Sequence, residues 1–141
     1  MAPEAQPNVV LIVSDEERRN DWLDGMADLP AHDRLVADGL SFTRHYTHSS
    51  PCSPSRASLL TGRYLPQHGV VDNVNFPEHT VLDPAIPTMG SLLREAGYES
   101  AYVGKWHLDV GAEPDLAAHG YSGWQGSDHH YVGGPWTGRG S

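Results

Sequence analysis

Continuous apolar runs and one alternating stretch predict three strands in this chain. Residues 8–13 read Asn-Val-Val-Leu-Ile-Val, a β-branched run that is typical of a strand buried on both faces of a parallel sheet. Residues 98–103 predict a second buried strand of the same kind. Between them, apolar and polar side chains alternate over Leu40–Tyr46, which predicts a third strand.

Helices are indicated by residues that favour helix starts and stops. Residues 29–39 carry a proline near the start and end in glycine, and residues 88–97 open with a capping threonine and close with Gly97. A third helix is predicted to begin at Ser53 as its N-cap and to end before Gly62. Residues 64–87 have little periodicity and several prolines and glycines, so we expect an ordered loop.

The order strand, helix, strand, helix, helix, strand predicts an α/β fold with a mainly parallel sheet flanked by helices. Three strands make a narrow sheet. From Asp109 onward the chain is rich in Gly, Pro, His and aromatic residues, and nothing there closes a domain. We therefore expect residues 1–141 to be the N-terminal part of a larger domain whose C-terminal remainder is absent.

Composition narrows the classes of function. The chain has 141 residues and a formal net charge of −9, without a Lys/Arg cluster, so nucleic acid and anionic membranes are poor partners. A single cysteine excludes an internal disulfide and a cysteine-rich zinc site. The first residues lack a basic segment, and the apolar run over 9–13 is too short for a signal peptide or a membrane span. We expect a cytoplasmic protein.

The segment around Cys52 combines features of an anion site. With Ser53 as N-cap and Pro54 at the first helical position, Cys52 would stand immediately before a helix N-terminus. Free backbone N–H groups and the helix dipole favour a bound anion there and favour a thiolate. Arg56, about one turn further, adds a planar set of donors that suits sulfate or phosphate. The alternative is a structural cysteine in a turn.

Two predicted strand ends carry further chemistry. The first strand runs into Asp15 and Glu16, whose oxygens suit a hard divalent cation, although a solvated acidic loop would have the same composition. The strand over 98–103 delivers Lys105 and His107 at its carboxyl end. Ligands of open α/β sheets bind at this edge, so a metal ion and a tetrahedral anion could meet beside position 52.

These motifs, in this order, resemble the type I sulfatases of the alkaline-phosphatase-like superfamily. Four stretches carry the resemblance, which covers nearly the whole chain: Pro7–Asp15 as first strand and metal-binding end, Cys52-Ser53-Pro54-Ser55-Arg56 as the sulfatase signature, Leu60-Thr61-Gly62-Arg63 as its continuation, and Gly104-Lys105-Trp106-His107-Leu108 as the second signature.

The resemblance implies a specific chemistry at Cys52. In that family a separate formylglycine-generating enzyme oxidises the cysteine to Cα-formylglycine, and a hydroxyl of the aldehyde hydrate attacks the sulfur of a sulfate ester. Position 52 is then nucleophile and metal ligand, and Arg56 stabilises the hydrate. Lys105 binds the sulfate oxygens, and His107 takes a proton from the second hydroxyl. The implied substrate is a sulfated small molecule or a sulfated glycan.

The resemblance also implies a metal ion, Ca²⁺ or in some relatives Mg²⁺ or Mn²⁺, with Asp15, Glu16 and position 52 as candidate ligands. Many sulfatases have Asp-Asp where this chain has Asp15-Glu16, so Asp15 is the firmer candidate. The family's other metal and substrate residues come later than residue 141. The segment Asp128-His129-His130 offers a metal pair in type, but its position matches a loop after the second signature.

Three other interpretations stay open from the residues. A phosphonate or phosphate ester hydrolase of the same superfamily would use the same site. A truncated sulfatase-like fragment would fold in part and lack catalysis. A Cys–His hydrolase would use the Cys52 thiolate with His107 or His48, but it gives no task to the acidic strand end or to Lys105.

Overall fold

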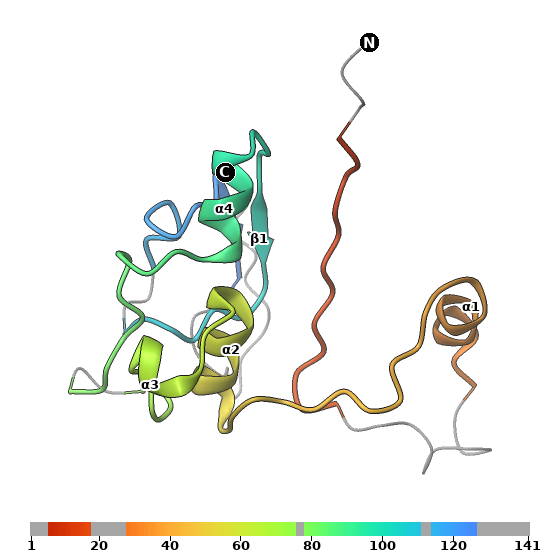
Figure 1. Cartoon of the computed structure of the whole chain (residues 1–141), viewed down its shortest axis with the longest axis horizontal. Helices are drawn as coiled ribbons and strands as arrows, with labels where there is room; N and C mark the ends of the chain where they lie inside the picture. The colour runs from red at the N-terminus through yellow and green to blue at the C-terminus, as the bar shows by residue number, and fades with distance from the viewer. Residues whose placement is uncertain (1–5, 18–27, 76–77, 111–113, 127–141) are drawn as a thin grey trace. The chain divides into compact units, whose positions relative to one another are not determined.

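In the computed structural model, the described residues are 6–17, 28–75, 78–110 and 114–126. The chain divides into two compact units, Met1–Arg44 and His45–Ser141. Among the residues that the structure describes, no helix has the length and apolar character needed to cross a membrane. Figure 1 shows the elements of both units along the chain.

The first unit contains helix α1 (Pro30–Asp38), which confirms the helix predicted over residues 29–39. Its first position is a proline, whose missing N–H would have no partner in a helix start anyway. The strand predicted over residues 8–13 is not formed, and Val10 and Ile12 are 83% and 81% exposed. An apolar run becomes a strand only where a neighbour takes up its backbone hydrogen bonds.

The second unit contains three helices and a pair of strands among its described residues. They are α2 (Cys52–Thr61), α3 (Leu65–His68), α4 (Met89–Glu95), β1 (Ala101–Val103) and β2 (Gly123–Gln125). The strands pair in parallel, with Tyr102 opposite Trp124. Figure 1 shows α3 beside α2, and these two helices contact each other.

Several predictions for this unit need correction. Residues 40–46, which lead into it, form no strand and contain a turn at residues 43–44. The expected loop over residues 64–87 contains α3, and β2 lies in a region where no strand was expected. The strand predicted as buried over 98–103 is shorter, and Val103 is 71% exposed. Only Tyr102, which points to the opposite face, packs on the core.

The predicted helix ends are confirmed where the signal is local. Gly62 ends α2 in the left-handed conformation, with φ of 65°, and its N–H donates to Ser58 O at 2.9 Å. Thr88 caps α4 by accepting a hydrogen bond from Ser91 N at 3.2 Å. Helix α4 therefore begins where the sequence indicated.

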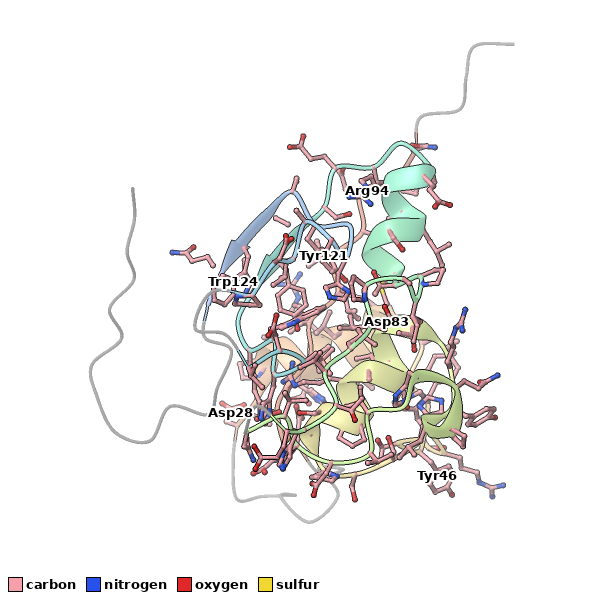
Figure 2. All side chains as sticks on the ribbon, turned by 90° about the vertical axis from the view of Figure 1, so that its left-hand side faces the viewer. Asp28, Tyr46, Asp83, Arg94, Tyr121 and Trp124 are labelled. Atoms are coloured by element: carbon pink, nitrogen blue, oxygen red, sulfur yellow. The ribbon has the colours of Figure 1, made fainter. Side chains whose placement is uncertain are left out.

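The core of the second unit is built around Trp106, which is fully buried. The rings of Tyr102, Tyr121 and His119 surround it, with centroids 5.4, 6.3 and 5.0 Å from the indole. Figure 2 shows the labelled Tyr121 near α4. A Cβ atom at Gly90 of this helix would lie 2.7 Å from the Tyr121 ring, so only glycine fits there. The remaining buried apolar residues are Ala57, Leu60, Val70, Val74, Leu82, Leu108 and Leu116.

Candidate active site

Helix α2 begins at Cys52 itself, two residues earlier than the first helical position, Pro54, that the sequence predicted. Cys52 is half-buried and occupies the first helical position, and Pro51 precedes it as N-cap without a capping side chain. The acceptor that a helix start needs comes from elsewhere in the chain. Asn73 Oδ1 accepts a hydrogen bond from Ser53 N at 3.0 Å.

Ser53 has a different task from the predicted capping role. Its hydroxyl donates to the backbone oxygen of His107 at 2.6 Å and accepts from Val74 N at 3.1 Å. Ser53 and Val74 are fully buried, and His107 is 1% exposed. A hydrogen bond over 54 positions thus ties the start of α2 to the segment that carries the second signature.

Arg56 connects the same two segments one turn further along α2. Its Nη1 donates to the backbone oxygen of Lys105 at 2.6 Å and to the Tyr102 hydroxyl at 3.3 Å. The Tyr102 hydroxyl also donates to Lys105 O, at 2.7 Å. The structure therefore holds the backbone of the Lys105–His107 segment beside the start of α2, which carries the candidate catalytic residues Cys52 and Arg56.

His107 is held in an unusual backbone conformation. Its φ is 58°, in the left-handed region that non-glycine residues seldom occupy, and such conformations persist only where the surroundings enforce them. Its main-chain oxygen is bound by Ser53 and its ring Nε2 donates to Asn75 Oδ1 at 2.9 Å. Sequence reasoning missed Asn73 and Asn75, and the only signal was a pair of asparagines two positions apart in an unassigned loop.

A second buried hydrogen bond, between His68 and Ser58, holds helix α2. Val70 N donates to His68 Nδ1 at 3.2 Å, so the neutral ring carries its proton on Nε2 and donates to Ser58 Oγ at 3.0 Å. Burial lowers the pKa of His68. The ring is neutral at neutral pH, and it joins α2 to the end of α3.

The candidate metal ligands are divided between the two units. Asp15 and Glu16 lie exposed in the first unit, and Cys52 lies in the second. Within residues 6–17, 28–75, 78–110 and 114–126, no group of three His, Cys, Asp or Glu side chains gathers to hold a metal ion. The oxygen donors of Asp15 and Glu16 fit a hard divalent cation in chemistry. The segment Asp128–His130 lies outside the described residues.

Comparison with known proteins assigns the chain to a family. A family model described as Sulfatase matches residues 7–132. The chain belongs to the sulfatase family. It is 33% identical over 138 residues to N-acetylgalactosamine-6-sulfatase of Homo sapiens, which aligns with 90% of this chain and 26% of that protein. The sequence-based resemblance to sulfatases is thereby confirmed.

Solved structures agree with this sulfatase assignment. The chain is similar to Ps i-CgsB, with a TM-score of 0.60 and 30% identity over 69% of this chain and 22% of that one. It is also similar to a protein in complex with its substrate D-glucosamine-2-N,6-O-disulfate, with a TM-score of 0.56 and 33% identity over 68% and 17%.

The matches and the parallel β1–β2 pair confirm the predicted fold class, a partial α/β domain of the sulfatase type. The chain spans about a fifth to a quarter of the length of the curated relatives it matches, from 20% to 26%. Most of the length of these relatives therefore has no counterpart in this chain.

Proposed function

We propose that this protein is a sulfuric ester hydrolase that cleaves sulfate monoesters at Cys52. One observation carries the proposal beyond family membership: the start of α2 is fastened to the Lys105–His107 segment by two hydrogen bonds of 2.6 Å, from Ser53 and from Arg56. These bonds hold the backbone of the segment that carries Lys105 and His107 next to the start of α2, and this supports a site that combines position 52, the Lys105 cation and the His107 imidazole. Such convergence is what acyl- or sulfuryl-type transfer needs.

The proposed nucleophile is Cys52 after conversion to Cα-formylglycine by a formylglycine-generating enzyme. Sulfatases generally use formylglycine together with a divalent metal ion. Asp15, Glu16 and position 52 would hold that ion, with Ca²⁺ as first candidate and Mg²⁺ or Mn²⁺ as others. When bound, it supplies positive charge that stabilises the developing negative charge on oxygen.

The remaining residues act on the substrate through ordinary electrostatics. The Lys105 ammonium binds sulfate oxygens and offsets the charge that builds up as the sulfur–oxygen bond breaks. His107 accepts a proton from the second hydroxyl of the hydrate at position 52, the one that does not attack sulfur. Arg56 stabilises the hydrate and, through its hydrogen bond to Lys105 O, sets where the Lys105 backbone lies.

A sulfated small molecule or a sulfated glycan is the proposed substrate class. The structural relative that binds D-glucosamine-2-N,6-O-disulfate supports this choice, because its identity to this chain is 33% over the aligned part. The phosphonate alternative uses the same kinds of residue, and no contact among the described residues favours it.

Mass spectrometry of the Cys52 peptide tests the proposal directly. Trypsin cuts after Arg44 and Arg56, so the peptide 45–56 carries the single cysteine. In protein from its natural host we expect a peptide lighter by one sulfur and two hydrogens and heavier by one oxygen. Cys52→Ala should abolish hydrolysis of an aryl sulfate and leave the circular dichroism spectrum unchanged. Turnover by Cys52→Ala, or an intact thiol in active protein, would refute the assignment.

A further inference from the structure

A three-residue segment, Asn73–Val74–Asn75, contacts both halves of the candidate site. We call it the 73–75 bridge. It belongs to neither sulfatase motif in the sequence, yet each of its residues makes a hydrogen bond to one of them. Asn73 and Val74 bind Ser53, and Asn75 binds His107.

At the α2 end, the bridge supplies the missing helix cap. Asn73 Oδ1 accepts from Ser53 N, the second N–H of the helix, at 3.0 Å. A capping asparagine ordinarily stands at the N-cap position, which here is Pro51. The side chain of Asn73 thus performs this task from 20 positions away. It fixes where the first turn, and therefore Cys52, lies.

At the other end, the bridge fixes the ring of His107. Asn75 Oδ1 accepts from Nε2 at 2.9 Å, while the backbone oxygen of the same histidine accepts from Ser53 Oγ at 2.6 Å. With the bonds of Asn73 and Val74 to Ser53, these two bonds form a closed circuit of contacts. The circuit runs from the 73–75 bridge to Ser53, on to His107 and back to the bridge. One residue pair, Ser53 and His107, is thereby held from both sides.

The Asn75 side chain differs from the rest of this circuit in its burial. Asn75 is exposed, whereas Ser53 and Val74 are fully buried and His107 is 1% exposed. An exposed amide contributes little to core packing. The main contribution of the Asn75 side chain is therefore its hydrogen bond to the His107 imidazole.

We propose that Asn75 is a positioning residue for sulfate ester hydrolysis, which orients the His107 imidazole toward position 52 by holding Nε2–H. This inference rests on the function proposed above. The bond places the proton of the neutral ring on Nε2 and the lone pair on Nδ1. Without it, the ring can turn about its side-chain bonds, and proton transfer loses its alignment.

Two substitutions of Asn75 separate positioning from general stability. Asn75→Leu keeps the approximate shape and removes the acceptor, whereas Asn75→Asp keeps an oxygen in the same place. We expect Asn75→Leu to lower kcat about 10- to 100-fold at unchanged KM, as for a misplaced catalytic group. Asn75→Asp should recover most of that loss. The control is Val71→Ala, in the same loop and 61% exposed, which should match the wild type.

The kcat values are compared only between preparations in which the same fraction of Cys52 has been converted to formylglycine. This fraction is measured on peptide 45–56. Equal kcat for Asn75→Leu and the wild type, or equal losses for Asn75→Leu and Asn75→Asp, would overturn the proposal. So would a loss that appears only in KM.

A second measurement works without any activity. In protein labelled with ¹⁵N-histidine, the Nε2–H signal of His107, assigned by its loss in His107→Gln, should persist in the wild type and in Asn75→Asp. It should vanish by fast exchange in Asn75→Leu. If the wild type hydrolyses no sulfate ester, the proposed function fails. The His107 signal then still decides whether Asn75 holds the ring, and its persistence in Asn75→Leu refutes the positioning role.

Discussion

Removal of the Ser58 hydroxyl should loosen α2 by an amount that the structure defines. Ser58 is 1% exposed, and its Oγ accepts from His68 Nε2 at 3.0 Å. His68 is 4% exposed, and its other ring nitrogen accepts from Val70 N at 3.2 Å. In Ser58→Ala the imidazole cannot turn over to find a new acceptor, because Val70 N–H still requires Nδ1. The Nε2–H is left buried with its main partner removed.

The size of the effect follows from two opposing contributions. Loss of the partner of a buried donor costs about 1–3 kcal/mol. Alanine is a better helix former than serine by up to about 0.7 kcal/mol, which offsets part of this cost. We therefore expect the free energy of opening of α2 to fall by about 1–2 kcal/mol, which is roughly a 5- to 30-fold change in the population of the open state.

Amide hydrogen exchange measures this quantity locally, so unfolding of the whole chain need not be two-state. The exchange of peptides from α2 and α3 should accelerate by the stated factor in Ser58→Ala. The matched control is Ser55→Ala on the same helix, whose hydroxyl meets Thr47 Oγ1 in an exposed pair at 3.0 Å and should change exchange little. Unchanged protection in Ser58→Ala, or equal effects of both substitutions, would refute this reasoning.

Two further predictions concern packing and pH. Gly120→Ala should destabilise the second unit by about 3 kcal/mol or more, because a Cβ there would lie 2.1 Å from Ser91 N. The control is Gly123→Ala, whose Cβ would meet nothing within 4 Å. Equal midpoints of thermal unfolding for the two variants would contradict the prediction. Burial lowers the pKa of His68 and of His119, so the unfolded chain binds more protons below about pH 6.5. The free energy of unfolding should therefore fall as the pH drops below that value, and a urea denaturation series that stays flat on acidification would contradict this.

The sequence predicted what is decided locally. Helix α1, the glycine end of α2 and the threonine cap of α4 each depend on residues within a few positions of one another. The sulfatase motifs were legible for a related reason, since each is a continuous stretch of residue types. The Cys52–Arg56 motif and the Lys105–His107 segment both lie in the second unit, in line with the strand-end argument for Lys105 and His107, although β1 is short; the Pro7–Asp15 motif lies in the first unit.

What the sequence did not predict depends on contacts between distant positions. Helix α2 starts at Cys52 and not after Ser53, because the cap comes from Asn73 and the serine hydroxyl is engaged by His107 O. Strand β2 pairs in parallel with β1, with Trp124 opposite Tyr102, and no local pattern predicts a pairing between positions this far apart. The run over 8–13 shows the converse case, in which a strong local pattern stays exposed and forms no strand.

The hydrogen bonds that hold the Lys105–His107 segment to α2 end on its main-chain oxygens. The backbone of this segment is therefore fixed, and these two bonds leave its side chains to the proposed chemistry. Arg56 donates to Lys105 O and Ser53 donates to His107 O, each at 2.6 Å. Neither bond uses the Lys105 ammonium or the His107 ring, so alignment of the backbone and chemistry of the side chains are assigned to different atoms. The same division accounts for the left-handed φ of 58° at His107. That conformation presents the carbonyl to Ser53 while the ring is directed separately by Asn75.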